Sequence, residues 1–251
     1  MHPIERIRAL ARASWLDPKS IAIEATEAIG DAYVWMDEPA AVAVARRLLA
    51  WHPYCGPLWW ACGEVLNAVD PAQASRDVVR CLLDDTTGLA LDVALPEGAR
   101  PLVVGRCRAM EEIGDCRARS VQDATHLLLG AAVLGPGGLV SDAPADALVA
   151  AAGDAGVPVW AVAERGAGVD AGLWARLEAL VRAAFVRPAA SAVTDVWWDD
   201  QDHDHAEPRL VELGSLDWVC GPDGLEVPAE AVADAPTTPR DLLDAAGAPA
   251  F

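Results

Sequence analysis

The chain has 251 residues, 53% of them hydrophobic and 23% charged, and its 38 acidic against 19 basic residues give a formal net charge of −19. This length and composition fit a folded globular protein with a sizeable core and exclude an intrinsically disordered chain. The acidic balance argues against a nucleic-acid partner, because a phosphate backbone needs lysine and arginine opposite it.

No run of about 18 uncharged apolar residues occurs, so we expect no membrane span. The first residues, MHPIERIRALARASW, lack the apolar core of a signal peptide. Six cysteines are scattered without a CxxC pair, which indicates reduced thiols rather than a disulfide framework. We therefore expect a cytoplasmic protein, and no pattern calls for a cofactor.

Residues 1–95 read as helices separated by proline-marked turns. Apolar spacing and breakers predict helices over residues 20–36, 38–52 and 57–69, and a fourth from residue 71 that breaks near Gly88. Ser20, after Pro18, is the expected N-cap of the first of these helices. Helices joined by such short loops predict a compact helical subdomain over residues 1–95.

The pattern changes after Pro96-Glu97-Gly98. All-apolar runs at residues 100–106, 125–131 and 157–164 alternate with helix-like segments at 145–156 and 170–185, which is typical of a parallel sheet buried on both faces. Residues 96–251 are thus expected to form a Rossmann-like, doubly wound, mostly parallel α/β domain. One or two edge strands are expected between residues 210 and 224, after an acidic loop at 195–207.

The stretch GAAVLGPGGLVSD, residues 130–142, follows the second predicted strand and precedes a helix. Ligands of parallel α/β sheets bind beyond the carboxyl ends of the strands, and glycines there let the backbone approach a ligand closely. A helix N-terminus also favours an anion. The stretch lacks the GxGxxG and GxxxxGK[ST] spacings, so the residues alone fit either a small-molecule site or a tight turn.

Two further groups of residues could form a metal site or a reactive thiol. His203 and His205 alternate within DDQDHDHAE, residues 199–207, so both could reach one zinc or nickel ion, although a solvated acidic loop is the simpler interpretation. Arg106 and Arg108 flank Cys107 and could lower its pKa, which would make a reactive thiol, although an ordinary half-buried cysteine is the simpler interpretation.

The block LLLGAAVLGPGGLVSDAPADALVAAAGDAGVPVWAVAE, residues 127–164, resembles the signature block of the translation initiation factor 2B alpha/beta/delta family. That family includes methylthioribose-1-phosphate isomerase and ribose-1,5-bisphosphate isomerase. HPYCGPLWWA, residues 52–61, is similar to its Arg-Pro-x-x-x-x-Leu-Trp segment, and VVGRCRA, residues 103–109, to its Glu-x-Arg-Pro segment. The resemblance implies a helical N-terminal domain, an α/β domain and a homodimer formed through the α/β domain.

The resemblance also implies positions for a site, and the catalytic ones are substituted. Gly130 begins the family's Gly-Ala-Asp, so Ala132 stands at its catalytic aspartate, and an alanine methyl cannot exchange a proton. The loop DDTTG places Asp85 where the isomerases have a catalytic cysteine.

The phosphate-binding positions differ as well. His52 stands at a phosphate-binding arginine of the isomerases, whereas Arg108 keeps its charge. The family's Asn-Lys-x-Gly-Thr falls on residues 141–145, so Asp142 reverses the charge of the lysine, next to Ser141. A phosphate at this loop would meet a carboxylate.

These departures predict a diverged, non-catalytic protein that acts in ligand binding or protein assembly. We expect a homodimer that holds a small phosphorylated metabolite or a partner protein. The alternative is an active aldose-1-phosphate to ketose-1-phosphate isomerase, with Asp85 as acid/base and Arg108 on the phosphate. The expected ligand-binding residues are His52, Arg108, Gly130, Ala132, Ser141 and Asp142.

Overall fold

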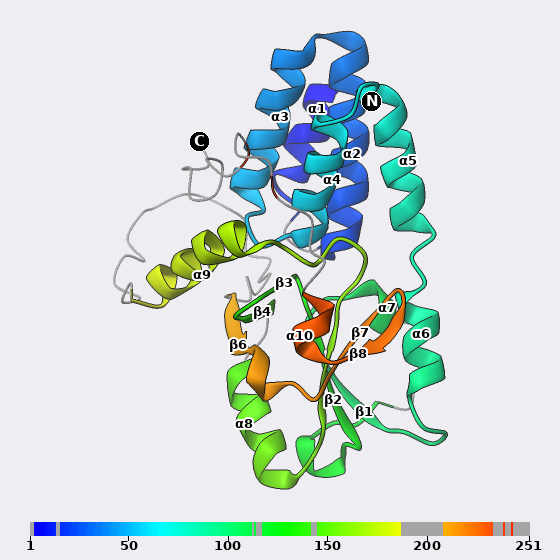
Figure 1. Cartoon of the computed structure of the whole chain (residues 1–251), viewed down its shortest axis with the longest axis vertical. Coiled ribbons are helices and arrows are strands. Elements are labelled where there is room, and N and C mark those ends of the chain that lie inside the picture. The colour runs from blue at the N-terminus through cyan, green and yellow to red at the C-terminus, as the bar shows by residue number, and fades with distance from the viewer. Residues whose placement is uncertain are drawn as a thin grey trace, which may run out of the picture.

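The computed structural model describes residues 3–13, 16–111, 113, 117–141, 145–186, 208–232, 238 and 242. It confirms the predicted fold class, with a helical bundle followed by an α/β part built on a mostly parallel sheet (Figure 1). The helices of the first part are α1 (Pro3–Leu10), α2 (Pro18–Trp35), α3 (Glu38–Trp51), α4 (Gly56–Leu66), α5 (Pro71–Leu83) and α6 (Thr87–Ala94).

The second part alternates strands and helices. Its strands are β1 (Pro101–Val104), β2 (His126–Gly130), β3 (Val133–Gly135), β4 (Gly138–Ser141), β5 (Val159–Val162), β6 (Arg209–Glu212), β7 (Trp218–Gly221) and β8 (Gly224–Glu226). Its helices are α7 (Arg108–Glu111), α8 (Ala145–Ala155), α9 (Ala171–Val186) and α10 (Pro228–Ala231), with 3-10 turns at Val121–Asp123 and Leu213–Ser215.

Three helices of the bundle begin in the same way, with an aspartate cap and a proline in the first turn. The Asp17 carboxylate accepts a hydrogen bond from the Ser20 amide at 2.9 Å, and Asp37 and Asp70 make the equivalent bonds at 2.8 and 3.0 Å. Such bonds satisfy amides that have no partner within the helix. The prediction that Ser20 caps α2 was wrong, because Asp17 accepts the bond and the helix already begins at Pro18.

The larger sheet has the order β1-β2-β5-β7-β8, in which the first four strands are parallel and β8 is an antiparallel edge. One face is covered by α6 and α7, whose Leu91 and Met110 pack on Leu128 and Trp160. The other face is covered by α8, whose alanines pack on Leu127, Leu129 and Ala161. Burial on both faces explains why the strands were readable as all-apolar runs.

The prediction of an open loop over residues 130–142 was wrong for most of its length. Strands β3 and β4 form a hairpin there, and β6 adds to β4 to make a separate three-stranded antiparallel sheet. Gly138 has a φ of +153°, and a Cβ on it would overlap the Val211 carbonyl oxygen of β6. This glycine therefore serves close strand packing rather than approach to a ligand.

The bundle and the α/β part share one core. Val133 and Val140 of the hairpin and Leu173 of α9 are buried together with Leu58 and Trp59 of α4. Helix α6 precedes residue 95 in the chain but packs on the larger sheet. The domain boundary predicted at residue 95 stays a prediction.

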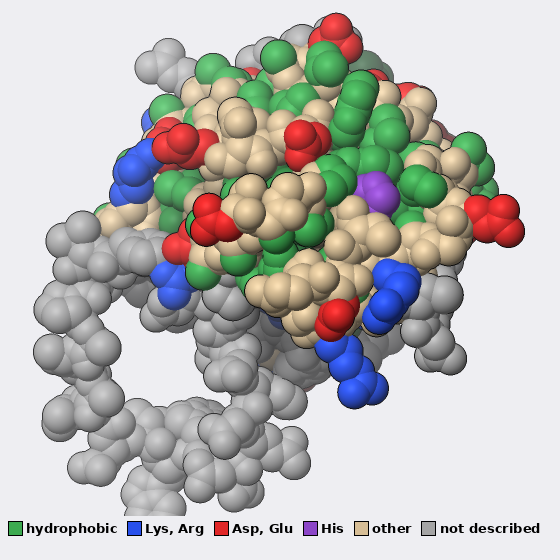
Figure 2. All heavy atoms as spheres, turned by 90° about the horizontal axis from the view of Figure 1, so that it is seen from below, with side chains coloured by type: hydrophobic (Ala, Val, Ile, Leu, Met, Phe, Trp, Pro, Cys, Tyr) green, Lys and Arg blue, Asp and Glu red, His purple; other side chains and the backbone are tan. Residues whose placement is uncertain are grey.

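Within the described part of the chain, no helix is both long and apolar enough to cross a membrane. The face seen from below carries its basic side chains in small groups near acidic ones, without a continuous basic surface (Figure 2).

We predict that Gly135→Ala lowers the free energy of unfolding by about 1–3 kcal/mol, because the added methyl group would overlap the buried Trp174 ring. Gly153→Ala in α8 is the matched control. A Cβ there has nothing within 4 Å, so it should be neutral or stabilise by about 0.5–1 kcal/mol. Urea denaturation of both variants checks this, and equal effects would contradict it.

Candidate functional site

A pocket of about 260 Å³ lies where the bundle meets the carboxyl ends of β1 and β2. Its polar groups belong to His52, Tyr54, Cys55, Arg106 and Ser141, and Ala132 forms part of its wall. No described lining residue is acidic. The other lining residues are Leu16, Pro18, Ile21, Trp51, Pro53, Val140 and Pro208.

Three of the residues predicted for the site meet in this pocket, namely His52, Ala132 and Ser141. Gly130 ends β2 and packs near Cys107, outside the described lining of the pocket. Asp85 and Arg108 also do not line it. Asp142, His203 and His205 lie outside the described residues. The carboxylate predicted at the phosphate-binding position and the predicted metal site therefore stay predictions.

The His52 ring is held at the end of α3, with Nε2 2.9 Å from the Leu10 carbonyl oxygen. Burial lowers the pKa of His52, the bond to Leu10 raises it, and the charge of Arg106 lowers it again, leaving it below the usual 6.5. We therefore expect a neutral ring at pH 7. With the Nε2 proton on Leu10, Nδ1 is left as a hydrogen-bond acceptor.

The positive charge at the pocket comes from Arg106, which sequence reasoning missed as a ligand-binding residue. Arg106 follows Gly105, which has a φ of +86° and ends the run of β1. The resemblance placed the charge on Arg108, which instead begins α7. A glycine directly after a parallel strand, followed by arginine, was the signal for Arg106, because such positions lie at the ligand-binding edge of the sheet.

Two more polar groups of the pocket differ in reactivity. The Ser141 side chain is fully buried, and its hydroxyl has no hydrogen-bond partner among the residues that the structure describes. An unpaired buried hydroxyl costs about 1–3 kcal/mol, which a bound polar group would recover. The Cys55 thiol donates to the Pro18 carbonyl oxygen at 3.2 Å, and burial raises its pKa to about 12, so it is not a nucleophile at neutral pH.

Beside the pocket lies a buried charge cluster of Lys19, Asp85 and Glu164. Lys19 Nζ is 3.2 Å from Asp85 Oδ2 and 3.6 Å from Glu164 Oε1. The Asp85 side chain is 0% exposed, and it also accepts bonds from the Thr87 amide, the Thr87 hydroxyl and the Arg165 amide at 3.1, 2.7 and 3.2 Å. The carboxylate thus has partners on both oxygens.

Glu164 completes the cluster at the carboxyl end of β5. Its carboxylate accepts from the Arg108 and Ala109 amides at 3.3 and 3.2 Å. Burial raises the pKa of Glu164, Lys19 lowers it, and Asp85 raises it, with a raised pKa as the result. For Asp85, burial raises the pKa, but the Thr87 hydroxyl, Lys19 and the Thr87 and Arg165 amides together outweigh burial and leave it lowered.

The pocket and the charge cluster are neighbours in the chain and in space. Pro18 lines the pocket while Lys19 holds the cluster, and Arg106 lines the pocket while Cys107 contacts Glu164. Burial raises the pKa of Cys107, and the charge of Glu164 raises it further. The hypothesis of an activated Cys107 thiol was therefore wrong.

The geometry defines a class: an α/β protein whose helical bundle covers the carboxyl ends of its parallel strands, with a small pocket at the junction. No protein-family model and no curated protein matches the chain. Solved structures are similar to it. The translation initiation factor eIF-2B of Pyrococcus horikoshii OT3 has a TM-score of 0.65 at 14% identity over 92% of this chain and 98% of that one.

Two structures from Chaetomium thermophilum are similar as well. eIF2B beta has a TM-score of 0.57 at 10% identity, covering 90% of this chain and 88% of its own. A chain of the tetrameric eIF2B-beta2-delta2 complex has a TM-score of 0.58 at 11% identity, covering 91% of each. The chain therefore has the eIF2B fold, which confirms the fold that the sequence resemblance implied.

We predict that Lys19→Met destabilises the protein by about 3–5 kcal/mol, because it leaves the buried Asp85 and Glu164 carboxylates without their cation. Arg6→Met is the control. Arg6 pairs with Glu24, Glu27 and Asp31, whose side chains are 41–50% exposed, so its loss should cost at most about 1 kcal/mol. Chemical denaturation distinguishes the two, and a small effect at Lys19 would contradict a structural cluster.

The contribution of Glu164 to the free energy of unfolding should depend on pH. The folded-state pKa of Glu164 is raised above the usual 4.5, so the folded state binds its proton more tightly than the unfolded state. Stability from this group is full below pH 4.5 and is lost as pH rises toward the folded-state pKa. Glu164→Gln removes that loss, so the cost of the substitution should shrink as pH rises through this window. Urea denaturation at several pH values measures it; a constant cost would contradict the raised pKa.

Proposed function

We propose that the chain is a diverged relative of the eIF2B-type proteins that binds a small anionic metabolite at the junction pocket and works through binding and assembly rather than catalysis. The observation that carries the proposal is the state of Asp85. This residue stands at the acid/base position of the isomerase alternative, yet its side chain is 0% exposed and is bonded to Lys19, Thr87 and Arg165.

The alternative of an active sugar-phosphate isomerase needs a group that exchanges a proton with the substrate. A candidate must come within hydrogen-bond reach of the substrate, directly or through one water. The two substituted catalytic positions supply no such group, because Asp85 does not line the pocket and Ala132 has no titratable group. The Cys55 thiol holds its proton, which leaves the neutral His52 ring as a proton acceptor in the described lining. These features support binding without turnover.

The composition of the pocket supports an anionic ligand. Arg106 contributes a guanidinium, and Ser141 contributes a hydroxyl that lacks a described partner. The described lining contains no carboxylate, although the chain as a whole carries −19. A volume of about 260 Å³ suits a ligand smaller than a nucleotide, such as a phosphorylated or carboxylated metabolite.

The assembly half of the proposal rests on other features. A structure with the same fold is described as a tetrameric complex, and we infer a homodimer through the α/β part for this chain. Trp218 on β7 is 40% exposed, which supplies apolar surface near the sheet edge. The described cysteines are free thiols, which supports a reducing compartment such as the cytoplasm.

The test is a thermal-shift screen of small phosphorylated and carboxylated metabolites against the purified chain. A ligand at a hundredfold excess over its Kd should raise Tm by about 5–10 °C. Arg106→Gln should weaken binding by about tenfold through loss of a charge-assisted contact. Arg100→Gln is the matched control, because Arg100 precedes β1 at the opposite end of the strand.

Turnover is measured in the same samples by following aldose 1-phosphates by NMR. We expect no ketose product. Conversion that Asp85→Asn abolishes would overturn the non-catalytic proposal, and the absence of any stabilising metabolite would remove the metabolite-binding part of it.

A further inference from the structure

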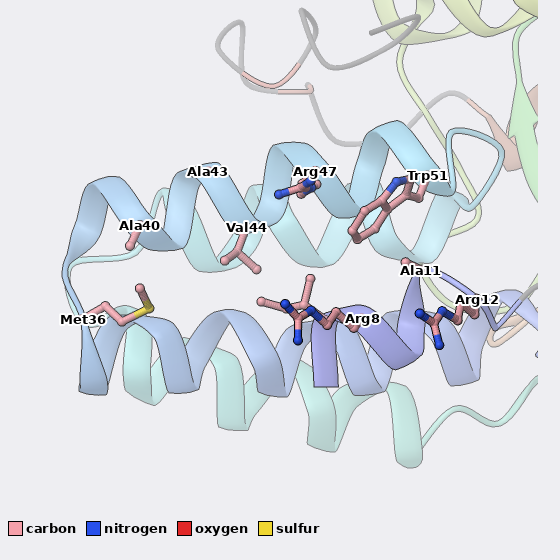
Figure 3. Close-up of a pocket in the computed structure, with 10 residues that line it drawn as sticks. Arg8, Ala11, Arg12, Met36, Ala40, Ala43, Val44, Arg47 and Trp51 are labelled. Atoms are coloured by element: carbon pink, nitrogen blue, oxygen red, sulfur yellow. The ribbon is translucent and has the colours of Figure 1, made fainter. Parts of the chain in front are cut away.

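A second, larger hollow lies in the bundle, between α1 and α3, with a volume of about 570 Å³. Its floor on α3 includes Ala40, Ala43 and Val44. Figure 3 shows Val44 pointing toward Arg8 of α1, with Met36 at one end of the hollow and Trp51 at the other. We call it the α1–α3 groove. The proposed metabolite site does not account for this groove.

The groove has the dimensions of a helix-binding site. Its α3 residues fall at positions 40, 43, 44, 47 and 51, a spacing of three and four that forms one stripe along the helix. From residue 40 to residue 51 this stripe runs about 16 Å, the length of about three helical turns. Alanines at positions 11, 40 and 43 leave room for a second backbone to approach closely.

The apolar lining is incompletely covered at one end. Met36 is 54% exposed, and the neighbouring Trp35 of α2 is 76% exposed. Large apolar side chains grouped beside a groove mark an interaction surface more often than scattered ones do.

The charge around the groove opposes that of the chain. Arg8, Arg12 and Arg47 line it, and none of its described lining residues is acidic, in a chain with 38 acidic residues. The Arg47 guanidinium lies 5.2 Å from the centre of the Trp51 ring. Arg8 Nη1 is bonded to Glu5 at 2.8 Å, but an exposed pair of this kind contributes little and can exchange partners.

We propose that the α1–α3 groove binds an amphipathic helix of an acidic partner protein. The apolar stripe of that helix would lie on Ala40, Ala43 and Val44, and aspartates or glutamates on its flanks would face Arg12 and Arg47. This is helix-in-groove recognition, in which apolar anchors give affinity and flanking charges select the partner. A second copy of this chain is the competing occupant, and the test below distinguishes it from a partner protein.

The probe is a fluorescent, helix-stabilised peptide of about 12 residues, with leucine and phenylalanine at i, i+3, i+4 and i+7 and glutamates on both flanks. Fluorescence anisotropy with the full chain should show saturable binding that weakens as salt rises. A peptide with lysines in place of the glutamates should not bind. Equal binding of the two peptides, or binding of neither, would overturn the proposal.

Two variants place the binding in the groove. Arg47→Glu should weaken binding by about tenfold or more, because it turns an attraction into a repulsion. Arg46→Glu is the matched control, since Arg46 is an exposed neighbour on α3 that does not line the groove. Ala43→Glu places a charge on the floor while keeping Arg47 on Trp51, and it should weaken binding to a similar degree.

Circular dichroism and Tm confirm that each variant is folded. If Arg46→Glu weakens binding as much as Arg47→Glu does, the attraction is general and the groove is not its site. Sedimentation tests whether the chain forms a dimer that Ala43→Glu dissociates. If it does, and the wild-type chain does not bind the peptide, a second copy occupies the groove and the proposal fails.

Discussion

The structure depends on three charges buried where the helical bundle meets the sheet. Lys19 belongs to the first turn of α2, Asp85 to the turn before α6, and Glu164 to the end of β5. Charges removed from water are tolerated only while they remain paired. The cluster therefore holds these segments in one mutual position, and Glu164 adds the start of α7 through two amides. The junction pocket lies beside this cluster, because Pro18, the chain neighbour of Lys19, lines it.

The same cluster bears on what the junction can do. A carboxylate that acts as a general acid or base must exchange protons with a substrate. Both oxygens of Asp85 are instead bonded to Lys19, Thr87 and Arg165. The described pocket lining includes His52, Arg106 and Ser141, whose side chains can donate, accept and neutralise charge. The junction thus retains polar groups for recognition, and the proposal of binding without turnover follows from the pairing of Asp85 inside the cluster.

Much of the architecture was predictable from the chain alone. The strands of the larger sheet are all-apolar because both of their faces are buried, and the helices of the bundle are marked by prolines near their starts. The β3–β4 hairpin was missed because its strands are three and four residues long, lie among glycines, and gain a third partner, β6, from far along the chain.

The site was predictable only in part. His52, Ala132 and Ser141 were predicted through the family resemblance, and the structure places them around one pocket. The partnership of Lys19 with Glu164 was missed, since a single lysine and a single glutamate carry no local pattern. Trp51 was read only as part of a helix, yet it lines both the junction pocket and the α1–α3 groove. If a ligand in one cavity shifts the Trp51 ring, it changes the affinity of the other cavity for its own ligand. Thermodynamic linkage then requires the second ligand to change the affinity for the first by the same factor.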